Sequence, residues 1–338
     1  MQAAVYHGKE DIRFQDWPDP ELSSGEILIK VRYTGICGSD MMIYGGKHPR
    51  AAPPRVLGHE VFGSVAETGK AVDPLWKKGT RVAVYPLISC GRCNPCKEGK
   101  AYVCEKLGLI GIDRDGGFAT YVKALPEQLV AVPDVVADDQ AALIEPLSVT
   151  VHAVRNSDFR PGDTALVTGG GPIGNLLAQV LRASGARDVV VSEVKPFRRD
   201  LAERMNFLTL DPTEKNPQEA LRQLTGERFV DHVFEASGQA PAYRDAIQCC
   251  KVRGEITFVG IPKSCPEVDI LGLVFKEIRT SSARVYTLQD YLGAIALLVR
   301  RSVDAASVVT DRLPLSDARL AFERTLSAEN CLKILLTP

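Results

Sequence analysis

The sequence predicts an α/β protein in which a partly barrel-like β domain precedes a doubly wound parallel sheet. Short β runs broken by Gly, Pro and Asp fill residues 1 to about 145. A glycine-rich turn between two apolar β runs follows near residue 169, and strand and helix patterns alternate beyond it. The 338 residues suffice for two domains with ample cores.

The β runs of the first part read ILIKVRYTG, VFGSVAETG, TRVAVYP and ATYVKAL, and they predict an antiparallel domain. From Thr164 onward the runs DVVVSEV, VDHVFEAS and EITFVGI alternate with helical patterns such as AYRDAIQCC, which predicts a parallel sheet. Near residue 290 the pattern changes again, to an amphipathic helix, YLGAIALLVRR, and a closing strand, CLKILLTP.

Four cysteines lie within fifteen residues, in CGRCNPCKEGKAYVC: Cys90, Cys93, Cys96 and Cys104. Two residues separate each of the first three, so one tight loop can direct three thiolates at a common point, and the fourth can close a tetrahedron. A closed four-thiolate shell is typical of structural zinc. A disulfide cluster or unrelated core thiols are the alternatives, which this spacing disfavours. Such a site leaves no position open for a substrate.

A second group of possible metal ligands has Cys37 in GICGSD, His59 and Glu60 in LGHE, and Glu145 in ALIEPLSV. A thiolate, an imidazole and one or two carboxylates can bind zinc while leaving one coordination position open. Zinc held in this way is a Lewis acid for an alcohol or carbonyl oxygen. Taken alone, Cys37 would be a small buried side chain and His59 a satisfied polar residue, but the next motif favours the catalytic interpretation.

The segment TALVTGGGPIGNLLAQVLRASGARDVVVSEV carries a dinucleotide-binding pattern. An apolar β run leads into Gly169, Gly171 and Gly174, a helical pattern follows, and a second β run ends at Glu193. The glycines let the backbone approach a pyrophosphate at the helix N-terminus, and Pro172 suits the first turn of that helix. Glu193 can accept hydrogen bonds from both ribose hydroxyls, which favours NAD over NADP.

These three groups, in this order, resemble the zinc-containing medium-chain dehydrogenase/reductase family over essentially the whole chain. The motifs GICGSD, LGHE, DGGFATY and LIEPLSV resemble most closely its polyol and sugar-acid branch, the sorbitol dehydrogenase-like enzymes. The resemblance implies a GroES-like catalytic zinc domain over residues 1–148, completed by about 288–338. It also implies a Rossmann nucleotide-binding domain over residues 149–287.

The resemblance further implies roles for single residues. The implied ligands of the catalytic zinc are Cys37, His59 and Glu60. Glu145 would be a further ligand or would hold a zinc-bound water, Ser39 would accept the substrate proton, and Arg284 would contact substrate hydroxyls or a carboxylate. The cofactor contacts that it adds to the glycine motif are Ile173, Glu193, Arg198, Val259, Gly260 and Ile261.

Three positions depart from the family pattern. Many relatives carry a proton-shuttling histidine where this chain has Met42, so the proton from Ser39 would leave through the cofactor ribose, water or another residue. Threonine dehydrogenases carry a histidine where this chain has Leu87, which argues against threonine as the substrate. Sorbitol dehydrogenases carry a tyrosine where this chain has Ile43, with Tyr44 one residue later, which argues against sorbitol itself.

Composition sets further limits. The formal net charge of −1 gives no electrostatic reason to expect nucleic acid or an anionic membrane as a partner. No apolar run approaches a membrane span, and MQAAVYHGKEDIRF has no signal-peptide core, so we expect a cytoplasmic protein. We also expect a homodimer or homotetramer. The remaining cysteines are interpreted as packing thiols of a reduced compartment: Cys249, Cys250, Cys265 and Cys331.

Four histidines lie outside the metal group. His152 is interpreted as a packed helix residue, with a metal or proton role as the alternative. His48 is interpreted as a solvated loop residue, with a substrate contact as the alternative. His7 and His232 are interpreted as structural.

The predicted reaction oxidises a secondary hydroxyl of a polyol or sugar acid to a ketone, reversibly, with two zinc ions per chain and NAD. Zinc lowers the pKa of the alcohol, Ser39 accepts the proton, and the nicotinamide takes the hydride. Lys195, Arg198 and Arg199 are bases that could accommodate the phosphate of NADP. The alternatives are a family member acting on another secondary alcohol, an amino alcohol or an amino acid, and a zinc-stapled nucleotide-binding sensor without catalysis.

Overall fold

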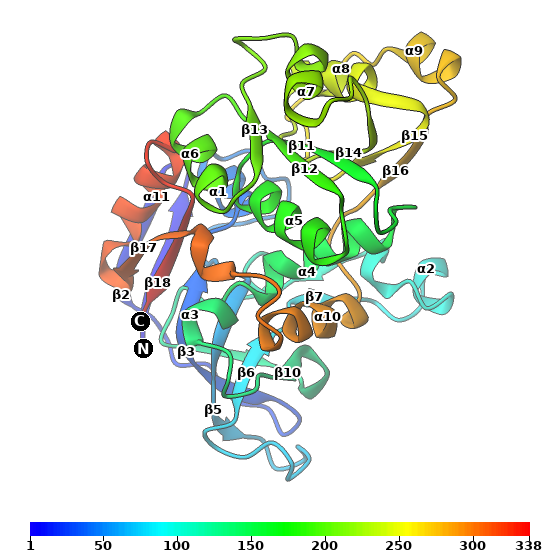
Figure 1. Ribbon diagram of the computed structural model, residues 1–338. Helices are drawn as coiled ribbons and strands as arrows, with labels where there is room; N and C mark the ends of the chain where they lie inside the picture. The colour runs from blue at the N-terminus through cyan, green and yellow to red at the C-terminus, as the bar shows by residue number, and fades with distance from the viewer. The chain divides into compact units, whose positions relative to one another are not determined.

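The structure, a computed structural model that describes residues 1–338, divides into two units (Figure 1). The first unit comprises Met1–Pro146, Thr287–Val299 and Ala305–Pro338, and the second comprises Leu147–Tyr286 and Arg300–Asp304. Segments from both ends of the sequence therefore build the first unit. Helix α4 (Ile144–Arg155) carries the chain from the first unit into the second.

The strands of the first unit form three sheets. The largest has seven strands in the order β10-β6-β5-β3-β18-β17, with β9 also paired to β3, and the smaller sheets are β2-β1-β4 and β7-β8. Their bounds are β1 Gln2–Gly8, β2 Asp11–Asp16, β3 Ile27–Gly35, β4 Arg55–Val56, β5 Glu60–Thr68, β6 Arg81–Val84, β7 Leu87–Ile88, β8 Gly108–Leu109, β9 Tyr121–Ala124, β10 Leu129–Ala131, β17 Val309–Pro314 and β18 Lys333–Thr337.

The strand pairs within residues 1–145 are antiparallel, as predicted, and one pair formed by the C-terminal segment differs from them. Strands β17 and β18 are parallel, whereas the other pairs of this unit are antiparallel. Helix α11 (Ala318–Ser327) lies between them in the sequence and returns the chain to the end where β17 began, as a parallel pair requires. Strand β18 then pairs with β3 in antiparallel register.

Strand β3 shows why this sheet forms. Ile27, Ile29 and Val31 are buried while Lys30 is exposed, the period of two that places alternate side chains on opposite faces. The alternation ends at Thr34 and Gly35, which are both buried. The core on the apolar face consists of Ile27, Ile29, Val31, Val61, Val65, Val82, Val84, Ile110, Val122, Ala124 and Leu129.

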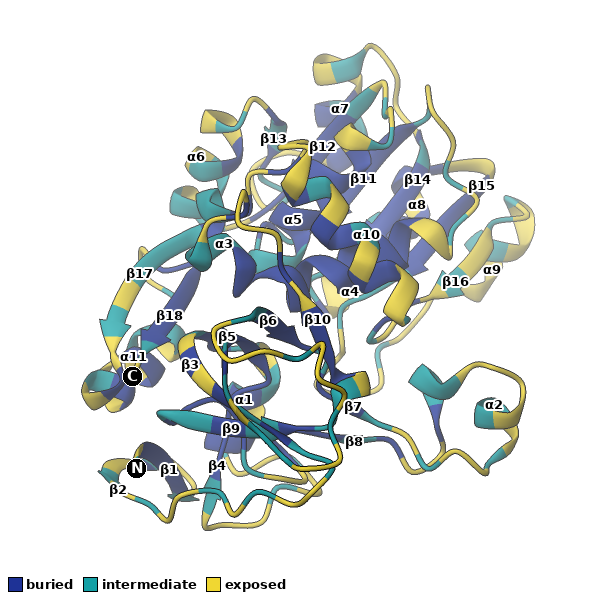
Figure 2. Cartoon of the chain, turned by 90° about the horizontal axis from the view of Figure 1, so that it is seen from below, coloured by how far each residue is buried: buried dark blue, intermediate teal, exposed yellow.

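The helices of the first unit are few and mostly short. They are α1 Gly38–Tyr44, α2 Asn94–Lys97, α3 Asp138–Ala141, α10 Leu288–Val299 and α11, with 3₁₀ turns η1 Ala101–Val103, η2 Pro126–Gln128, η3 Ala305–Val308 and η4 Leu315–Asp317. Figure 2 shows α2 on a loop whose residues are mostly exposed or half-buried. A loop with so little apolar core of its own needs another means of holding its shape.

The second unit is a parallel sheet in the order β13-β12-β11-β14-β15-β16. The chain starts at the centre with β11, runs outward to β13, and resumes beside β11 with β14, so the strand order reverses between β11 and β14. The bounds are β11 Thr164–Thr168, β12 Asp188–Ser192, β13 Leu208–Leu210, β14 Val230–Glu235, β15 Cys250–Phe258, β16 Arg279–Ser282, α5 Pro172–Ala183, α6 Pro196–Arg204, α7 Pro217–Thr225, α8 Ala240–Cys249 and α9 Ile270–Phe275.

The central strands β11, β12 and β14 are largely buried, whereas α9 and β16 are largely exposed (Figure 2). Every residue of β11 is buried, as expected for a central parallel strand covered on both faces. One core cluster comprises Leu166, Val190, Leu210, Ala220, Leu221, Val230, Val233, Ala246, Ile247, Cys249, Cys250 and Ile256. None of the helices has the length and apolar character needed to cross a membrane.

Candidate active site

Strands β3 and β5 bring together the side chains of the predicted catalytic metal group. Gly35 of β3 lies opposite Glu60 of β5 in antiparallel register, and Cys37 follows two residues after Gly35. The ligand atoms of Cys37, His59 and Glu60 all lie within 4.8 Å of one another. His59 and Glu60 are buried and Cys37 is half-buried. The three side chains thus form a compact donor group that could hold one metal ion.

The charges around this group favour a cation. Burial disfavours the charged imidazole, but Cys37 and Asp40 outweigh it and raise the pKa of His59 well above its usual value, and Glu145 adds to the rise. His59 Nδ1 is buried and has no hydrogen-bond partner. Thiolate, imidazole and carboxylate are donors that zinc accepts, and an unsatisfied imidazole nitrogen among acidic groups fits such an ion.

Asp40 is a buried residue of this site that the sequence analysis missed. It is fully buried, it accepts a hydrogen bond from the Cys37 backbone N–H at 2.9 Å, and its Oδ1 lies 3.8 Å from Nδ1 of His59. Burial raises the pKa of its carboxyl, and His59 opposes the rise. Asp40 therefore caps α1 and faces the imidazole, which limits how the ring can turn. Its place three residues after Cys37 is the signal that could have revealed it.

Lys333 is a second missed residue. Its Nζ lies 2.5 Å from both carboxylate oxygens of Glu60 and donates to the Ile36 carbonyl at 2.8 Å. Burial alone would lower the pKa of this lysine, but Glu60 and Cys37 raise it. Lys333 is therefore a buried cation that directly contacts one of the three metal-binding side chains. It lies 273 residues from Glu60 in the sequence, so no local motif reveals the pair.

The other residues predicted to take part in catalysis are placed as follows. Ser39 is half-buried in the first turn of α1, two residues after Cys37. Glu145 is buried near the start of α4 and is close enough to affect the pKa of His59, but it is not one of the three residues whose ligand atoms lie within 4.8 Å. Arg284 belongs to the second unit, follows β16 and is exposed.

The four-cysteine loop converges as its spacing predicts. The ligand atoms of Cys90, Cys93, Cys96 and Cys104 lie within 4.8 Å of one another, and Sγ of Cys93 lies 3.4 Å from that of Cys96 and 3.7 Å from that of Cys104. Cys93 precedes α2, and Cys104 follows the turn η1. The four thiols are free rather than paired as disulfides, so the loop could hold a tetrahedral zinc ion.

Backbone N–H groups around these sulfurs favour thiolates. Hydrogen bonds from the Arg92 and Cys93 backbone lower the pKa of Cys90 to about 6. Burial, followed by the hydrogen bonds to Cys93 and Cys104, raises the pKa of Cys96 to about 12. The Cys90 thiol therefore ionises readily while the Cys96 thiol resists ionisation, because four neighbouring thiolates would repel one another without a cation. Zinc would supply that cation.

The glycine-rich turn after β11 has the tight geometry that its sequence requires. Gly169 has φ +95°, and a Cβ on Gly174 would lie 1.7 Å from the Gly169 carbonyl oxygen. Helix α5 begins at Pro172 directly behind Gly171, with Ile173 in its first turn. The turn therefore presents the N-terminus of a twelve-residue helix, where a phosphate can be bound.

Glu193 lies at the end of β12 beside this turn. Its two carboxylate oxygens accept backbone N–H groups of Gly170 and Lys195, each at 2.8 Å, and Arg198 Nη1 lies 3.8 Å away. Arg199 instead pairs with Asp211 at 2.7 Å and donates to the Glu193 carbonyl. Of the two predicted arginines, only Arg198 thus approaches the Glu193 carboxylate and the glycine turn.

Glu235, at the end of β14, is a third residue that the sequence analysis missed. It is fully buried, its carboxylate accepts the backbone N–H groups of Ser237 and Gly238, and its carbonyl accepts those of Val259 and Gly260. Glu235 thereby joins two loops at the point where the strand order reverses, which is where doubly wound sheets bind ligands. Ile261, next in the predicted nicotinamide loop, is 73% exposed.

Most of the other histidines and cysteines have structural surroundings. His232 contacts Asp163 at 3.1 Å, and His7 contacts Gln15 at 3.0 Å. Nδ1 of His48 lies 3.3 Å from the backbone nitrogens of Arg50 and Ala51, so this ring nitrogen is engaged in its own loop. Helix α4 holds His152 in a buried position. Three of the four remaining cysteines are buried, but Cys265 is exposed, which corrects its interpretation as a packing thiol.

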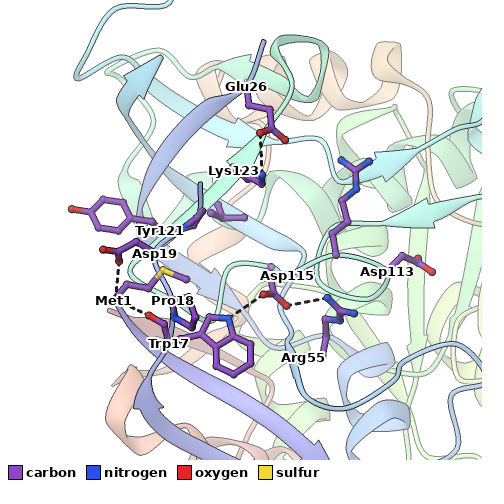
Figure 3. A pocket seen from close by; sticks show the side chains of 14 residues that line it. Met1, Trp17, Pro18, Asp19, Glu26, Arg55, Asp113, Asp115, Tyr121 and Lys123 are labelled. Atoms are coloured by element: carbon purple, nitrogen blue, oxygen red, sulfur yellow. Dashed lines mark hydrogen bonds and ion pairs between the residues drawn. The ribbon is translucent and has the colours of Figure 1, made fainter. Parts of the chain in front are cut away.

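A cavity of about 560 Å³ lies in the first unit, and none of the predicted site residues line it (Figure 3). Its charged side chains mostly hold one another: Asp115 accepts from Trp17 and pairs with Arg55, and Lys123 pairs with Glu26. Asp113 accepts the Leu109 backbone N–H at 2.8 Å. The carboxylates of Asp113 and Asp115 therefore stabilise the structure around their own loop.

Two family models match the chain. The alcohol dehydrogenase GroES-like domain matches residues 23–134, and the zinc-binding dehydrogenase family matches residues 172–300. The chain belongs to the zinc-dependent medium-chain dehydrogenase/reductase family, in the branch of polyol and sugar-acid dehydrogenases. Its members act on CH–OH groups, so the chain is an oxidoreductase for a small molecule, and the predicted fold class is confirmed.

Three relatives illustrate the range of substrates. The chain is 36% identical to 2-dehydro-3-deoxy-L-galactonate 5-dehydrogenase of Pseudoalteromonas atlantica, covering 95% of this chain and 94% of the relative. It is 33% identical to sorbitol dehydrogenase of Bacillus subtilis, covering 100% and 97%. It is 31% identical to L-threonine 3-dehydrogenase of Rhizobium etli, covering 98% and 97%.

Two solved structures illustrate the range of cofactors. An alcohol dehydrogenase from Escherichia coli, complexed with NADH, superposes with a TM-score of 0.92 at 28% identity, covering 100% of this chain and 99% of that one. A zinc-binding dehydrogenase from Sinorhizobium meliloti, bound to NADP, superposes with a TM-score of 0.93 at 30% identity, with the same coverage. Both nicotinamide cofactors therefore occur among close structural neighbours.

Proposed function

We propose that this protein is a zinc- and NAD-dependent dehydrogenase that reversibly oxidises a secondary hydroxyl of a polyol or sugar acid to a ketone. The observation that carries the proposal is the group of Cys37, His59 and Glu60, whose ligand atoms lie within 4.8 Å in a member of a zinc-binding dehydrogenase family. The proposed catalytic zinc has these three ligands, with Glu145 a further ligand or the holder of a bound water. The four-cysteine loop would hold a second, structural zinc.

The catalytic roles follow from these residues. Bound zinc supplies a Lewis acid that lowers the pKa of the substrate hydroxyl, and bound NAD accepts the hydride from its carbon. Ser39 takes the hydroxyl proton and passes its own to the cofactor ribose, to water or to another residue, because Met42 cannot carry it. Asp40 keeps the His59 ring in place, and Arg284 binds a neighbouring substrate hydroxyl or a carboxylate.

NAD is the proposed cofactor because of the surroundings of Glu193. The carboxylate is fixed by two backbone N–H groups and is buried, so a 2′-phosphate would meet a negative charge that cannot move away. Arg199 is held by Asp211, which leaves Arg198 as the arginine that could favour NADP. The glycine turn, Ile173 and the loop Val259–Ile261 complete the proposed cofactor site.

The proposed domain division follows the predicted one, a catalytic domain over 1–148 completed by about 288–338, and a nucleotide-binding domain over 149–287. We further propose that the enzyme works in the cytoplasm, where thiolate sites of this kind stay reduced. Its proposed assembly is a homodimer or homotetramer. Strand β16 is an open sheet edge, and nearby α9 exposes Ile270, Leu271, Val274 and Phe275 by 61 to 78%, which suits pairing with a second copy.

The test is a substrate panel of sugar alcohols, aldonates, L-threonine and ethanol with NAD and with NADP, followed by absorbance of the reduced cofactor. We expect the largest kcat/KM with a polyol or sugar acid and NAD. Ethanol outperforming every hydroxylated compound would contradict the substrate class. Comparable kcat/KM with NADP would show that Arg198 outweighs Glu193.

The amino-alcohol class is a second candidate because relatives of equal coverage include threonine dehydrogenase. Threonine turnover in the same panel would establish it, and Leu87 in place of the histidine of those enzymes argues against it. A protein that binds zinc and NAD but reduces no cofactor with any compound would instead support the sensor alternative.

A further inference from the structure

The ion pair between Lys333 and Glu60 is more deeply buried than the other lysine–carboxylate pairs of the first unit. The side chains of Lys333 and Glu60 are 3% and 1% exposed, and Nζ lies 2.5 Å from each carboxylate oxygen. The Ile36 carbonyl is a further acceptor, at 2.8 Å. Removing an ammonium group from water is costly, so a buried lysine persists only where its partners compensate for that cost.

The ion pair occupies space that a side chain at position 35 would fill, and this position is a glycine. A Cβ on Gly35 would lie 1.9 Å from Glu60 Oε2 and 3.1 Å from Lys333 Cε. Gly35 lies opposite Glu60 in β3–β5 and opposite Leu335 in β3–β18, so two strand registers bring the lysine and the carboxylate together over one glycine. The pair is therefore built into the sheet and is no chance contact of flexible side chains.

Glu60 has two competing cationic partners. It belongs to the group of three side chains that could hold a metal ion, yet Lys333 already contacts both of its oxygens. Any metal at this group must share the carboxylate with the ammonium or displace it. The ammonium also repels a dication at short range, and such repulsion is strong where water is excluded.

We propose that Lys333 is a positioning residue that holds the Glu60 carboxylate in the metal-free protein and lowers the affinity of the Cys37–His59–Glu60 group for zinc. The inference rests on the proposed function in taking this group as the zinc site. Without Lys333, the metal-free protein retains the buried Glu60 carboxylate beside Cys37 and Asp40 but loses the ammonium that contacts both of its oxygens. Zinc compensates for that loss when it binds, so the variant should bind zinc more tightly while its metal-free form becomes less stable.

The test measures zinc affinity and stability of the full chain. Metal-free wild type, Lys333→Met and Lys333→Arg are titrated with zinc against a chromophoric chelator, and unfolding midpoints are recorded with and without zinc. Lys123→Met is the matched control, because Lys123 also pairs with a glutamate of the same unit, Glu26 at 3.0 Å, but away from the metal group. Each variant is repeated with Cys37→Ser, which leaves the four-cysteine loop as the other zinc site.

We expect Lys333→Met to bind zinc about tenfold more tightly or better, with a lowered unfolding midpoint that zinc largely restores. The gain should vanish with Cys37→Ser, and Lys333→Arg and Lys123→Met should keep wild-type affinity. A Lys333→Met protein that folds only with zinc would also support the proposal. Wild-type or weaker affinity, equal destabilisation with and without zinc, or failure to fold in both conditions would overturn it.

These outcomes separate the inference from the function on which it rests. If Cys37→Ser binds as many zinc ions as the wild type, the Cys37 group is no zinc site and the proposed function fails. If Cys37→Ser loses one zinc ion but Lys333→Met keeps wild-type affinity, only the role of Lys333 fails.

Discussion

The buried side chain of Asn175 is expected to lower the stability of the protein. It lies in α5, is fully buried, and has no hydrogen-bond partner for either polar atom of its amide. An unsatisfied buried amide costs roughly 1–3 kcal/mol, whereas an apolar group of similar shape does not incur this cost. We expect Asn175→Leu to raise the unfolding midpoint of the protein by a few degrees.

Asn216 is the matched control for this prediction. Its side chain accepts the backbone N–H groups of Gln218 and Glu219 at the start of α7. Asn216→Ala should therefore lower the free energy of unfolding by about 1 kcal/mol. Thermal unfolding of both variants gives the comparison, and a lowered midpoint for Asn175→Leu would mean that its amide has a partner, such as a buried water.

Ser39 is the residue proposed to accept the substrate proton, and its replacement tests that role. It is the hydroxyl residue two positions after Cys37, and Met42 cannot carry a proton. We expect Ser39→Ala to lower kcat at neutral pH by roughly a hundredfold or more, the usual effect of an acid–base group. Zinc content and cofactor affinity, measured on the same preparation, should not change.

Arg284→Ala provides the contrast, since it should chiefly raise KM for hydroxylated substrates and leave kcat less affected. Near-normal turnover of Ser39→Ala would show that the proton leaves the substrate by another route. The two variants together separate proton transfer from substrate binding.

Some residues of the site could be identified from a local sequence motif, and others could not. Cys37, His59 and Glu60 stand in short patterns whose donor types suggest zinc, and the structure brings their ligand atoms together. Their roles stay predictions until metal binding is measured. Asp40 lies three residues after Cys37, but its role depends on a burial that the sequence does not show. Lys333 could not be assigned from a motif, because strand registers join it to a distant part of the sequence.

At the scale of elements, the turn between β11 and α5 depends on Gly174. A Cβ there would lie 1.7 Å from the Gly169 carbonyl oxygen, a backbone atom that cannot rotate away. We expect Gly174→Ala to displace the turn and to weaken NAD binding at least about tenfold, measured by quenching of protein fluorescence. Gly25→Ala is the control, because its Cβ would meet nothing within 4 Å. Unchanged NAD affinity of Gly174→Ala would show that the cofactor binds elsewhere.

The four-cysteine loop and the Cys37 group should respond differently to loss of a ligand. The loop has little apolar core, so its zinc would hold its shape, and Cys93→Ser should mainly lower the unfolding midpoint. Cys37→Ser should abolish turnover with the fold retained, because strands β3 and β5 stay paired without it. Elemental analysis should find two zinc ions in the wild type and one in each variant. Active protein without bound zinc would contradict both assignments.

The elements themselves were predictable to different degrees. The alternation of Ile27, Ile29 and Val31 and the glycine turn are local patterns, and the structure has β3 and β11–α5 at those places. The parallel pairing of β17 with β18 was not predicted, because pairing direction depends on where α11 returns the chain. Local periodicity carries no information about that.

At the scale of the whole molecule, family and fold class were predictable because three motifs in a fixed order occur together, and the family matches confirm them. The substrate was not, because its selectivity depends on side chains that no motif defines. Relatives of similar identity act on a sugar acid, on sorbitol and on threonine.

Assembly is the last property that can be tested at this scale. Strand β16 (Arg279–Ser282) ends the parallel sheet, and three of its four residues are exposed. Nearby α9 exposes Leu271 by 66% and Phe275 by 78%, although it has only six residues. A sheet edge and large apolar side chains left open to water favour association, and a second copy can pair edge to edge around a twofold axis.

We therefore expect the wild type to have the mass of a dimer, or of a dimer of dimers, in light scattering coupled to size-exclusion chromatography. Phe275→Asp should shift the mass toward the monomer, because it would introduce a charge into each half of the interface. Leu75→Asp is the control, since Leu75 is equally exposed, at 79%, but belongs to the first unit. A wild type that stays monomeric at micromolar concentration, or a Phe275→Asp variant with unchanged mass, would show that α9 does not form the interface.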